Sequence, residues 1–360
     1  MAVSKVDAAN QIENKLPQAN IANNVNFRNI VINGSMDISQ RATSTQFTGA
    51  GYHALDRWQV YISSLGTHTM SQDSSVPTGQ GFSKSLKIAC DTADSSPAAG
   101  DQFYLRTKFE GQNLQYLRYG TSSAQKLTLS FWVKSNKTTT ASVQLQDHDN
   151  SKMVTKSYTI NTADTWEKKT ITFNANTSNS FTNDNNLSLD VRWWLDSGSD
   201  FTSGTPSGDW EANDNTKRNN NNLGLASSDT NTFFLTGVQL EVGDTASDFE
   251  FLPVDINLAR CQRYFWRSYA DTFYFKPAKN NQRHAKTTFP VTMRSQPTAT
   301  YFPTNSDLEA GTNSGKAAKD VGATTVSTSN VGGDRNYDTA ILTDTSDSNF
   351  RVNTKADAEL

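Results

Sequence analysis

Residues 187–198 read LSLDVRWWLDSG, and the alternation in this stretch decides the fold class. Successive side chains of a β-strand point to opposite faces of its sheet. One face therefore carries the apolar row Leu187, Leu189, Val191, Trp193 and Leu195. The other face carries Ser188, Asp190, Arg192, Trp194 and Asp196. The stretch predicts a half-buried strand in which Trp193 belongs to the core and Trp194 to the polar side.

The same alternation recurs from residue 26 to residue 253, between clusters of Gly, Asn, Asp and Ser. QKLTLSFWVKS places one apolar row on a single face: Leu127, Leu129, Phe131 and Val133. FFLTGVQLEVG is expected to form another row: Phe234, Thr236, Val238, Leu240 and Val242. Many short strands of this kind predict an antiparallel sandwich or jelly roll.

Composition narrows the classes of partner. The 360 residues include 19% charged residues and carry a net charge of −3, so the chain as a whole does not attract a phosphate backbone electrostatically. No nucleic-acid partner is therefore expected. No apolar run is long enough to span a bilayer, and the start of the chain has no apolar signal region, so we expect no membrane insertion and synthesis in a cytosol. Two cysteines are too few for a disulfide framework.

Four segments follow from these patterns, and the predicted fold class is all-β, a jelly-roll β-sandwich followed by a small C-terminal β domain. Residues 1–25 are expected to form a polar arm that orders against a partner, with an unstructured terminus as the open alternative, and residues 26–254 are expected to form the sandwich. Residues 255–270, with the helical pattern NLARCQRYFWRSY, form a helical linker, and residues 271–360 form the small β domain. Within the sandwich, residues 197–230 are rich in turn-forming residues and predict a long loop.

Aromatic rings on the polar faces of several predicted strands suggest a binding surface. Trp194 lies beside Arg192, Trp132 lies beside Thr128 and Ser130, and Tyr104 lies beside Arg106. A pyranose stacks its C–H face on an aromatic ring while its hydroxyls take directed hydrogen bonds. The predicted glycan-binding residues are Tyr104, Trp132, Gln144, Arg192 and Trp194. The alternative is that loop 197–230 or another subunit covers these rings.

A second group of aromatic and basic residues follows the predicted helix. The predicted interface residues are Arg263, Tyr264, Phe265 and Trp266, which are the residue types that anchor subunit contacts. A nucleic-acid surface is the less favoured interpretation, because the group is isolated in an acidic protein.

No catalytic or metal-binding residues are predicted. Asp190 and Asp196 are expected on one face, but roughly 20 Å apart along a strand, which is too far for a glycosidase pair. Asp147, His148 and Asp149 are expected to form a hairpin turn, and the histidines are scattered, so no transition-metal site is expected. No cofactor is predicted, although calcium is compatible with such a sandwich without assignable ligands.

Several stretches resemble a known family. NIVINGSMDISQRATS, HALDRWQV, FYLRTKFEGQNLQYL and the more specific LTGVQLEVG with CQRYF are similar to virion fibre and tail proteins of marine bacteriophages, especially cyanophages. FPVTMRSQPTATY and the final ADAEL resemble the C-terminal region of these proteins. The resemblance covers residues 26–360 and implies a sandwich similar to carbohydrate-binding modules.

The resemblance also implies a functional setting. Such proteins are virion components, assembled in the host cytoplasm, that form homotrimers and contact other tail or capsid proteins and a host cell-surface glycan. The predicted function is that of a non-catalytic bacteriophage fibre or tail adhesin. Two alternatives stay open, a purely structural virion component and a glycan-depolymerising tailspike.

Overall fold

The computed structural model describes residues 27–267, 271–273, 282–302, 326–327, 337–343 and 350–360. The predicted N-terminal arm, residues 1–25, lies outside these residues. The chain forms two compact units. The sandwich unit comprises residues up to Asp37, Ser44–His53 and Trp58–Phe251, and the C-terminal unit comprises Ile38–Thr43, Ala54–Arg57 and Leu252–Leu360.

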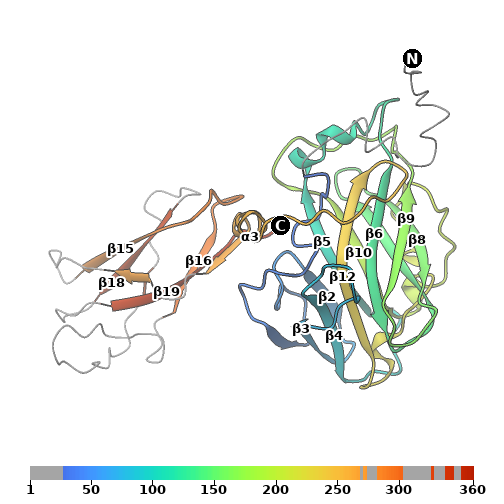
Figure 1. The fold of residues 1–360 in the computed structure, drawn as a ribbon, viewed down its shortest axis with the longest axis horizontal. Helices are drawn as coiled ribbons and strands as arrows, with labels where there is room; N and C mark the ends of the chain where they lie inside the picture. The colour runs from blue at the N-terminus through green and yellow to red at the C-terminus, as the bar shows by residue number, and fades with distance from the viewer. Residues whose placement is uncertain (1–26, 268–270, 274–281, 303–325, 328–336, 344–349) are drawn as a thin grey trace, which may run out of the picture. The chain divides into compact units, whose positions relative to one another are not determined.

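The sandwich unit consists of two antiparallel sheets of six strands each (Figure 1). The first sheet has the order β1 (Ser44–Phe47), β3 (Thr67–Asp73), β4 (Ser85–Thr92), β12 (Thr232–Val242), β6 (Leu127–Ser135), β9 (Glu167–Phe173). The second has the order β11 (Glu211–Ala212), β8 (Lys152–Thr159), β7 (Thr140–Asp147), β10 (Leu187–Ser197), β5 (Gln102–Glu110), β2 (Gln59–Ser63). The predicted jelly-roll sandwich is confirmed.

The core of the sandwich lies between the two sheets, and Trp193 is at its centre. Trp193 in β10 has no exposed surface, and its ring meets Phe131 of the opposite sheet edge-on at 5.7 Å between centroids. Trp58 packs against the same tryptophan at 5.6 Å. The predicted assignment of Trp193 to the core is therefore correct, and the alternation of β6 is correct as well, since Leu127, Leu129, Phe131 and Val133 are all fully buried.

The predicted row along β12 is wrong in its first half. The pairing of β12 with β6 shifts between Thr236 and Gln239, which is a β-bulge, and Gly237 adopts a φ of +59°. The bulge exchanges the two faces of the strand. Phe233 and Leu235 therefore have no exposed surface, while Phe234 lies on the outer face and contacts the ammonium group of Lys134 at 4.0 Å.

A second bulge lies in β10 between Trp194 and Asp196. Trp194 pairs with Tyr104 and Asp196 pairs with Phe103, a core residue, so Asp196 lies on the core side of the strand. The prediction that Asp190 and Asp196 share an outer face is therefore wrong. Asp196 instead accepts hydrogen bonds from the backbone of Ala226 and from the amide of Asn222, each at 2.8 Å.

The C-terminal unit contains a helix and short strands. The helix α3 spans Val254–Gln262, and the strands are β13 (Phe265–Arg267), β14 (Asp271–Phe273), β15 (Gln282–Thr288), β16 (Thr298–Phe302), β17 (Val326–Ser327), β18 (Tyr337–Thr343) and β19 (Phe350–Asp357). Strands β13, β14 and β16 pair with β19, while β15 and β17 pair with β18. Of the described residues of the predicted linker 255–270, those up to Gln262 are helical, while Phe265–Arg267 pairs as a strand with β19.

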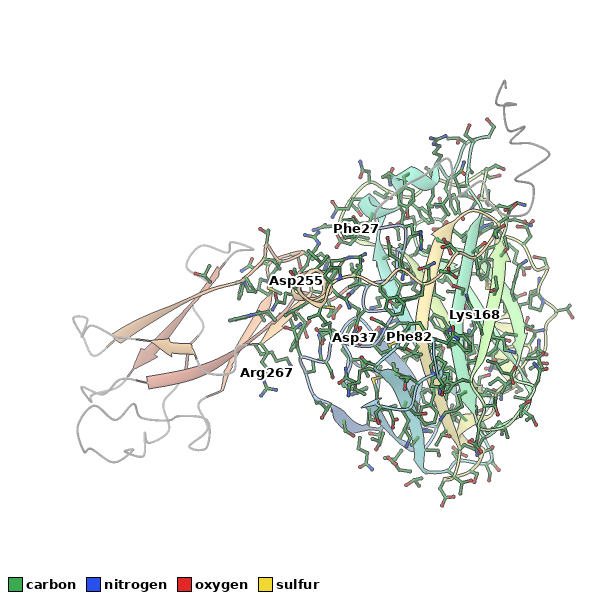
Figure 2. The ribbon with its side chains drawn as sticks, in the orientation of Figure 1. Phe27, Asp37, Phe82, Lys168, Asp255 and Arg267 are labelled. Atoms are coloured by element: carbon green, nitrogen blue, oxygen red, sulfur yellow. The ribbon has the colours of Figure 1, made fainter. Side chains whose placement is uncertain are left out.

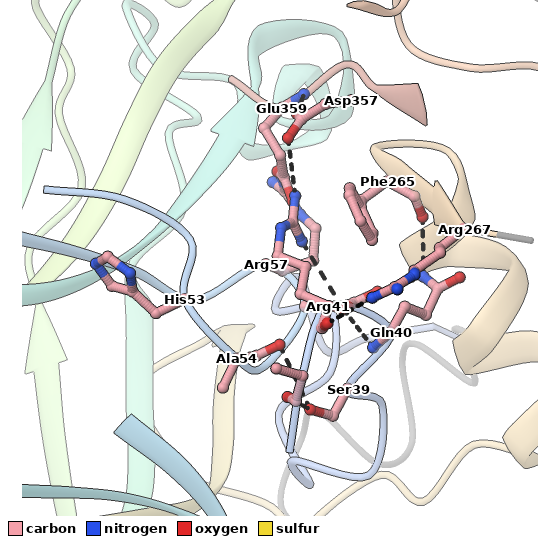
Figure 3. A network of polar contacts seen from close by, with 12 residues as sticks. Ser39, Gln40, Arg41, His53, Ala54, Arg57, Phe265, Arg267, Asp357 and Glu359 are labelled. Atoms are coloured by element: carbon pink, nitrogen blue, oxygen red, sulfur yellow. Dashed lines mark hydrogen bonds and ion pairs between the residues drawn. The ribbon is translucent and has the colours of Figure 1, made fainter. Parts of the chain in front are cut away.

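A buried polar network joins the early segments of the C-terminal unit to its last residues (Figure 3). The Arg41 guanidinium lies 3.3 Å from Glu359 and 3.8 Å from Asp56. Arg57 forms an ion pair with Glu359, and Gln40 donates its backbone N–H to Asp56 at 2.9 Å. Residues 38–43 and 54–57 are thus held to this unit by charge pairing that crosses some three hundred residues of sequence.

No helix within the described residues is long and apolar enough to cross a bilayer.

Candidate functional site

The outer face of the second sheet collects polar and aromatic side chains from adjacent strands. Cross-strand pairing aligns them in three rows. The first row is Gln59, Arg106, Arg192 and Gln144; the second is Tyr61, Tyr104 and Trp194; the third is Lys108, Asp190 and Gln146. We call this surface the outer polar face.

Asp190 is the centre of an ion cluster on the outer polar face and has no exposed surface. Its Oδ1 accepts from Nε of Arg192 at 2.8 Å, and its Oδ2 accepts from Nη2 of the same residue at 3.0 Å. Oδ2 also accepts from Arg106 at 3.2 Å and from Nε2 of His148 at 3.1 Å. Arg106 and Arg192 are directly paired across β5 and β10, so this carboxylate offsets the repulsion between two like charges.

The charges of this cluster are mutually stabilised. Burial alone would raise the pKa of Asp190, but Arg192, His148 and Arg106 together hold it well below its ordinary value. Burial lowers the pKa of Arg192, yet Asp190 outweighs this effect and raises it. Both groups therefore stay ionised in neutral and mildly acidic solution.

A ladder of aromatic rings runs alongside this cluster. Tyr61 and Tyr104 are stacked with their centroids 5.1 Å apart and their planes 7° from parallel. Tyr104 contacts Trp194 at 5.0 Å, and Trp194 contacts Phe201 at 5.5 Å. The Arg192 guanidinium lies 5.0 Å from the Tyr104 ring centroid. Tyr61 is partly exposed, whereas the other rings are buried.

The segment from residue 197 to residue 230 packs onto the outer polar face. Its short 3-10 helix η3 (Ser199–Phe201) carries the Phe201 ring that covers Trp194. Farther along, Arg218 follows the 3-10 helix η4 (Asn215–Lys217) and donates to Oε1 of Gln146 at 2.9 Å. The alternative that this loop covers the tryptophan is therefore the correct one for Trp194.

The predicted glycan-binding residues are only partly brought together. Tyr104, Gln144, Arg192 and Trp194 lie in adjacent strands, and Nε1 of Trp194 donates to Oε1 of Gln144 at 3.3 Å. Trp132 does not join them, because β6 belongs to the opposite sheet. The expectation of an open platform is also wrong for Gln144 and Trp194, which have no exposed surface. Gln144 and Trp194 therefore lie beneath the outer polar face and are not accessible to a ligand.

The predicted interface residues are engaged within their own unit. Tyr264 and Phe265 are each 1% exposed, so they are not available to a partner subunit as anchors. The guanidinium groups of Arg57 and Arg41 lie 3.5 and 3.6 Å from the centroids of these two rings. Trp266 packs against Phe289 at 5.6 Å, and the carbonyl of Arg263 accepts from the backbone of Arg294 at 2.7 Å.

Residues 148–151 form the turn between β7 and β8, as expected for a hairpin. Asp147 accepts from the backbone of Asn150 at 3.0 Å, as is typical of such turns. Within the described part of the chain, no group of three or more His, Cys, Asp or Glu side chains is placed to hold a metal ion.

Sequence reasoning missed the residues that give the outer polar face its accessible atoms. Gln59, Tyr61, Arg106, His148 and Arg218 are all partly exposed, and they come from four separate parts of the chain. Alternation placed Arg106 beside Tyr104, but only the register of β2 and β5 brings Tyr61 and Gln59 to them. No sequence pattern indicates that Arg218 reaches this face, because it lies in a loop whose path is set by tertiary contacts.

Comparison with solved structures finds matches at low sequence identity and low TM-score. The bacteriophage CBA120 tailspike protein 4 enzymatically active domain aligns at 14% identity and a TM-score of 0.32, over 60% of this chain and 22% of its own. The module TmCBM61, solved with β-1,4-galactotriose, aligns at 10% identity and a TM-score of 0.31, over 60% and 99%. The family 11 carbohydrate-binding module of a Clostridium thermocellum cellulase aligns at 12% identity and a TM-score of 0.27, over 56% and 98%. No family model and no curated protein matches the sequence.

Proposed function

We propose that the sandwich unit binds a host-surface glycan on its outer polar face, as part of a non-catalytic bacteriophage fibre or tail adhesin. One observation carries this proposal: a partly exposed tyrosine, Tyr61, stacks on Tyr104 beside the side chains of Gln59 and Arg106. Sugar sites combine an aromatic surface with a few directed polar groups, and this arrangement supplies both. The resemblance of the sequence to phage fibre and tail proteins supplies the setting, a homotrimer attached to other virion proteins.

A binding role fits the charges better than catalysis does. A glycosidase acid needs a raised pKa and a second carboxylate across the sugar. The pKa of Asp190 is instead held well below its ordinary value once its three basic neighbours overcome the effect of burial, and Asp196 lies on the opposite side of β10. Several weak sites on one trimer would act together, so modest affinity at each site suffices for attachment.

A glycan array with the purified chain tests this proposal. Tyr61→Ala removes the accessible ring and is expected to weaken binding by about two- to tenfold, since aromatic stacking contacts are worth about 0.5–1.5 kcal/mol. Tyr116→Ala is the matched control, because Tyr116 is 50% exposed and lies outside the outer polar face. Equal losses in both variants, or unchanged binding by Tyr61→Ala, would count against the site.

The burial of Trp194 and Gln144 supports a second candidate, a purely structural virion component. In this case the ion cluster and the aromatic ladder serve to hold loop 197–230 against the sheet. This candidate predicts that the chain binds no glycan on the array while it assembles normally into particles.

A further inference from the structure

The outer polar face carries more positive charge than its own carboxylates neutralise. Arg106, Arg192 and Arg218 converge there, and within the described residues only Asp190 lies within ion-pair distance of any of them. Asp190 already pairs with Arg106 and Arg192. Arg218 reaches the face through the amide of Gln146, whose strand position is paired with Asp190.

Two guanidinium groups keep a nitrogen for a ligand. Arg106 donates Nε to Gln59 at 2.7 Å and Nη1 to Asp190, which leaves Nη2 without a partner among the described residues. Its side chain keeps 14% of its surface exposed. The second ring nitrogen of His148, whose side chain is 29% exposed, is likewise available beside it.

Arg218 repeats this arrangement from the opposite side. Its Nε donates to Asn215 and its Nη1 to Gln146, each at 2.9 Å, while Nη2 has no partner in the described part of the chain. Burial and the neighbouring Arg192 both lower the pKa of Arg218, and the smaller opposing effects of Tyr104, Asp190 and Asp214 do not restore it. An anion beside these nitrogens would remove an electrostatic conflict that the protein itself leaves in place.

We infer that the glycan recognised by the outer polar face is acidic, and that its anionic groups are bound by Arg106, on the Tyr61 side of the face, and by Arg218, which lies over β7. Guanidinium groups form short, charge-assisted hydrogen bonds to carboxylate and sulfate oxygens. The ring takes the apolar face of the sugar, and the arginines take the charge. This inference rests on the proposed function and specifies its substrate class.

Matched polymers that differ only in charge provide the test. Affinities of the full chain are measured for polygalacturonate and its fully methylated ester, and for dextran sulfate and unmodified dextran. We expect binding to at least one acidic polymer to be about tenfold tighter than to its neutral form. The first pair reports recognition of a carboxylate and the second recognition of a sulfate ester.

Substitutions assign that preference to the proposed residues. Arg218→Gln is expected to reduce the preference about tenfold, and Arg218→Lys, which keeps the charge but loses the planar fork, to reduce it less. Lys168→Gln is the matched control, because Lys168 is an exposed residue of β9 in the other sheet (Figure 2). Urea unfolding of each variant verifies that the sandwich is intact.

The outcomes separate the two proposals. Equal binding of acidic and neutral polymers, still lost in Tyr61→Ala, overturns the acidic class and leaves glycan binding in place. Binding to none of these polymers or to the wider array overturns both. A preference that Lys168→Gln weakens as much as Arg218→Gln reflects general charge attraction and overturns the assignment to this face.

Discussion

The ion cluster around Asp190 gives a direct test of what holds the second sheet together. Asp190→Asn keeps the shape of the side chain and removes its charge. The wild-type carboxylate accepts from Arg192 at 2.8 and 3.0 Å, from Arg106 at 3.2 Å and from His148 at 3.1 Å, without any exposed surface. After the substitution, two guanidinium groups face each other across β5 and β10 with no carboxylate between them.

Loss of one partner from a buried ion pair costs about 3–5 kcal/mol. The amide of asparagine retains one acceptor, and the Arg106 side chain is 14% exposed, so we place the cost for Asp190→Asn at about 3 kcal/mol. With a urea m-value of about 3 kcal/mol/M for a unit of this size, the midpoint falls by about 1 M. Arg192→Gln combined with Asp190→Asn should cost less than the sum of the single changes, because the two residues share one interaction.

Urea unfolding followed by tryptophan fluorescence measures this change, with Asp229→Asn, at an exposed position, as the matched control. The pKa of Asp190 is depressed in the folded state, because its basic neighbours overcome the effect of burial. The contribution of Asp190 to the free energy of unfolding is therefore present above its unfolded-state pKa, and it is lost only as pH falls through its folded-state pKa. The penalty should therefore persist at pH 4.5. A midpoint for Asp190→Asn within about 0.2 M (about 0.6 kcal/mol) of the Asp229→Asn midpoint would refute the reasoning.

Two further predictions concern backbone strain and pH. Gly237→Ala should destabilise the sandwich by about 3 kcal/mol in urea unfolding, because the φ of Gly237 is +59° and the new Cβ would lie 2.5 Å from Phe82. The control Gly79→Ala should cost only about 1 kcal/mol, because Gly79 has a similar φ of +75° but open space around it. Equal costs for the two variants would exclude the steric contribution of Phe82. In the C-terminal unit, burial raises the pKa of Asp56 from 3.8 to about 6, against Arg41 and Gln40. The folded unit therefore binds a proton at Asp56 more tightly than the unfolded chain does. Its free energy of unfolding should increase by up to about 3 kcal/mol as pH falls from 7 to 4. Hydrogen exchange of the amides of residues 38–43 should show this gain in the wild type and lose it in Asp56→Asn, and an unchanged pH dependence in the variant would contradict it.

The alternation of apolar and polar side chains was enough to predict most of the sandwich. It identified the sandwich, placed Trp193 in the core and assigned the outward row of β10 as far as Trp194. It failed where the backbone adds a residue, because each bulge exchanges the two faces beyond it. Gly237 could have indicated the bulge in β12, because a glycine inside a strand often marks a bulge. The bulge before Asp196 has no glycine to indicate it.

The site was harder to predict than the fold, for a physical reason. Alternation states which face of a strand a residue occupies, but not which strands are neighbours. Trp132 and Trp194 have the same local pattern, yet they belong to opposite sheets. Tyr61 and Arg218 could be added only from strand register and from the path of loop 197–230, which long-range contacts determine.

The layering of the outer polar face explains how residues without exposed surface can still serve recognition. Gln144 accepts from Trp194, and Trp194 packs against Tyr104, which in turn stacks on Tyr61. Asp190 binds both Arg192 and the partly exposed Arg106. Side chains that are ordered before a ligand arrives lose less conformational entropy when it binds. Substitution of a buried supporting residue should therefore weaken binding through loss of order, while substitution of Tyr61 or Arg218 removes contacts directly. Trp194, the second of the two adjacent tryptophans, thus acts as the base of the surface that we propose contacts the sugar.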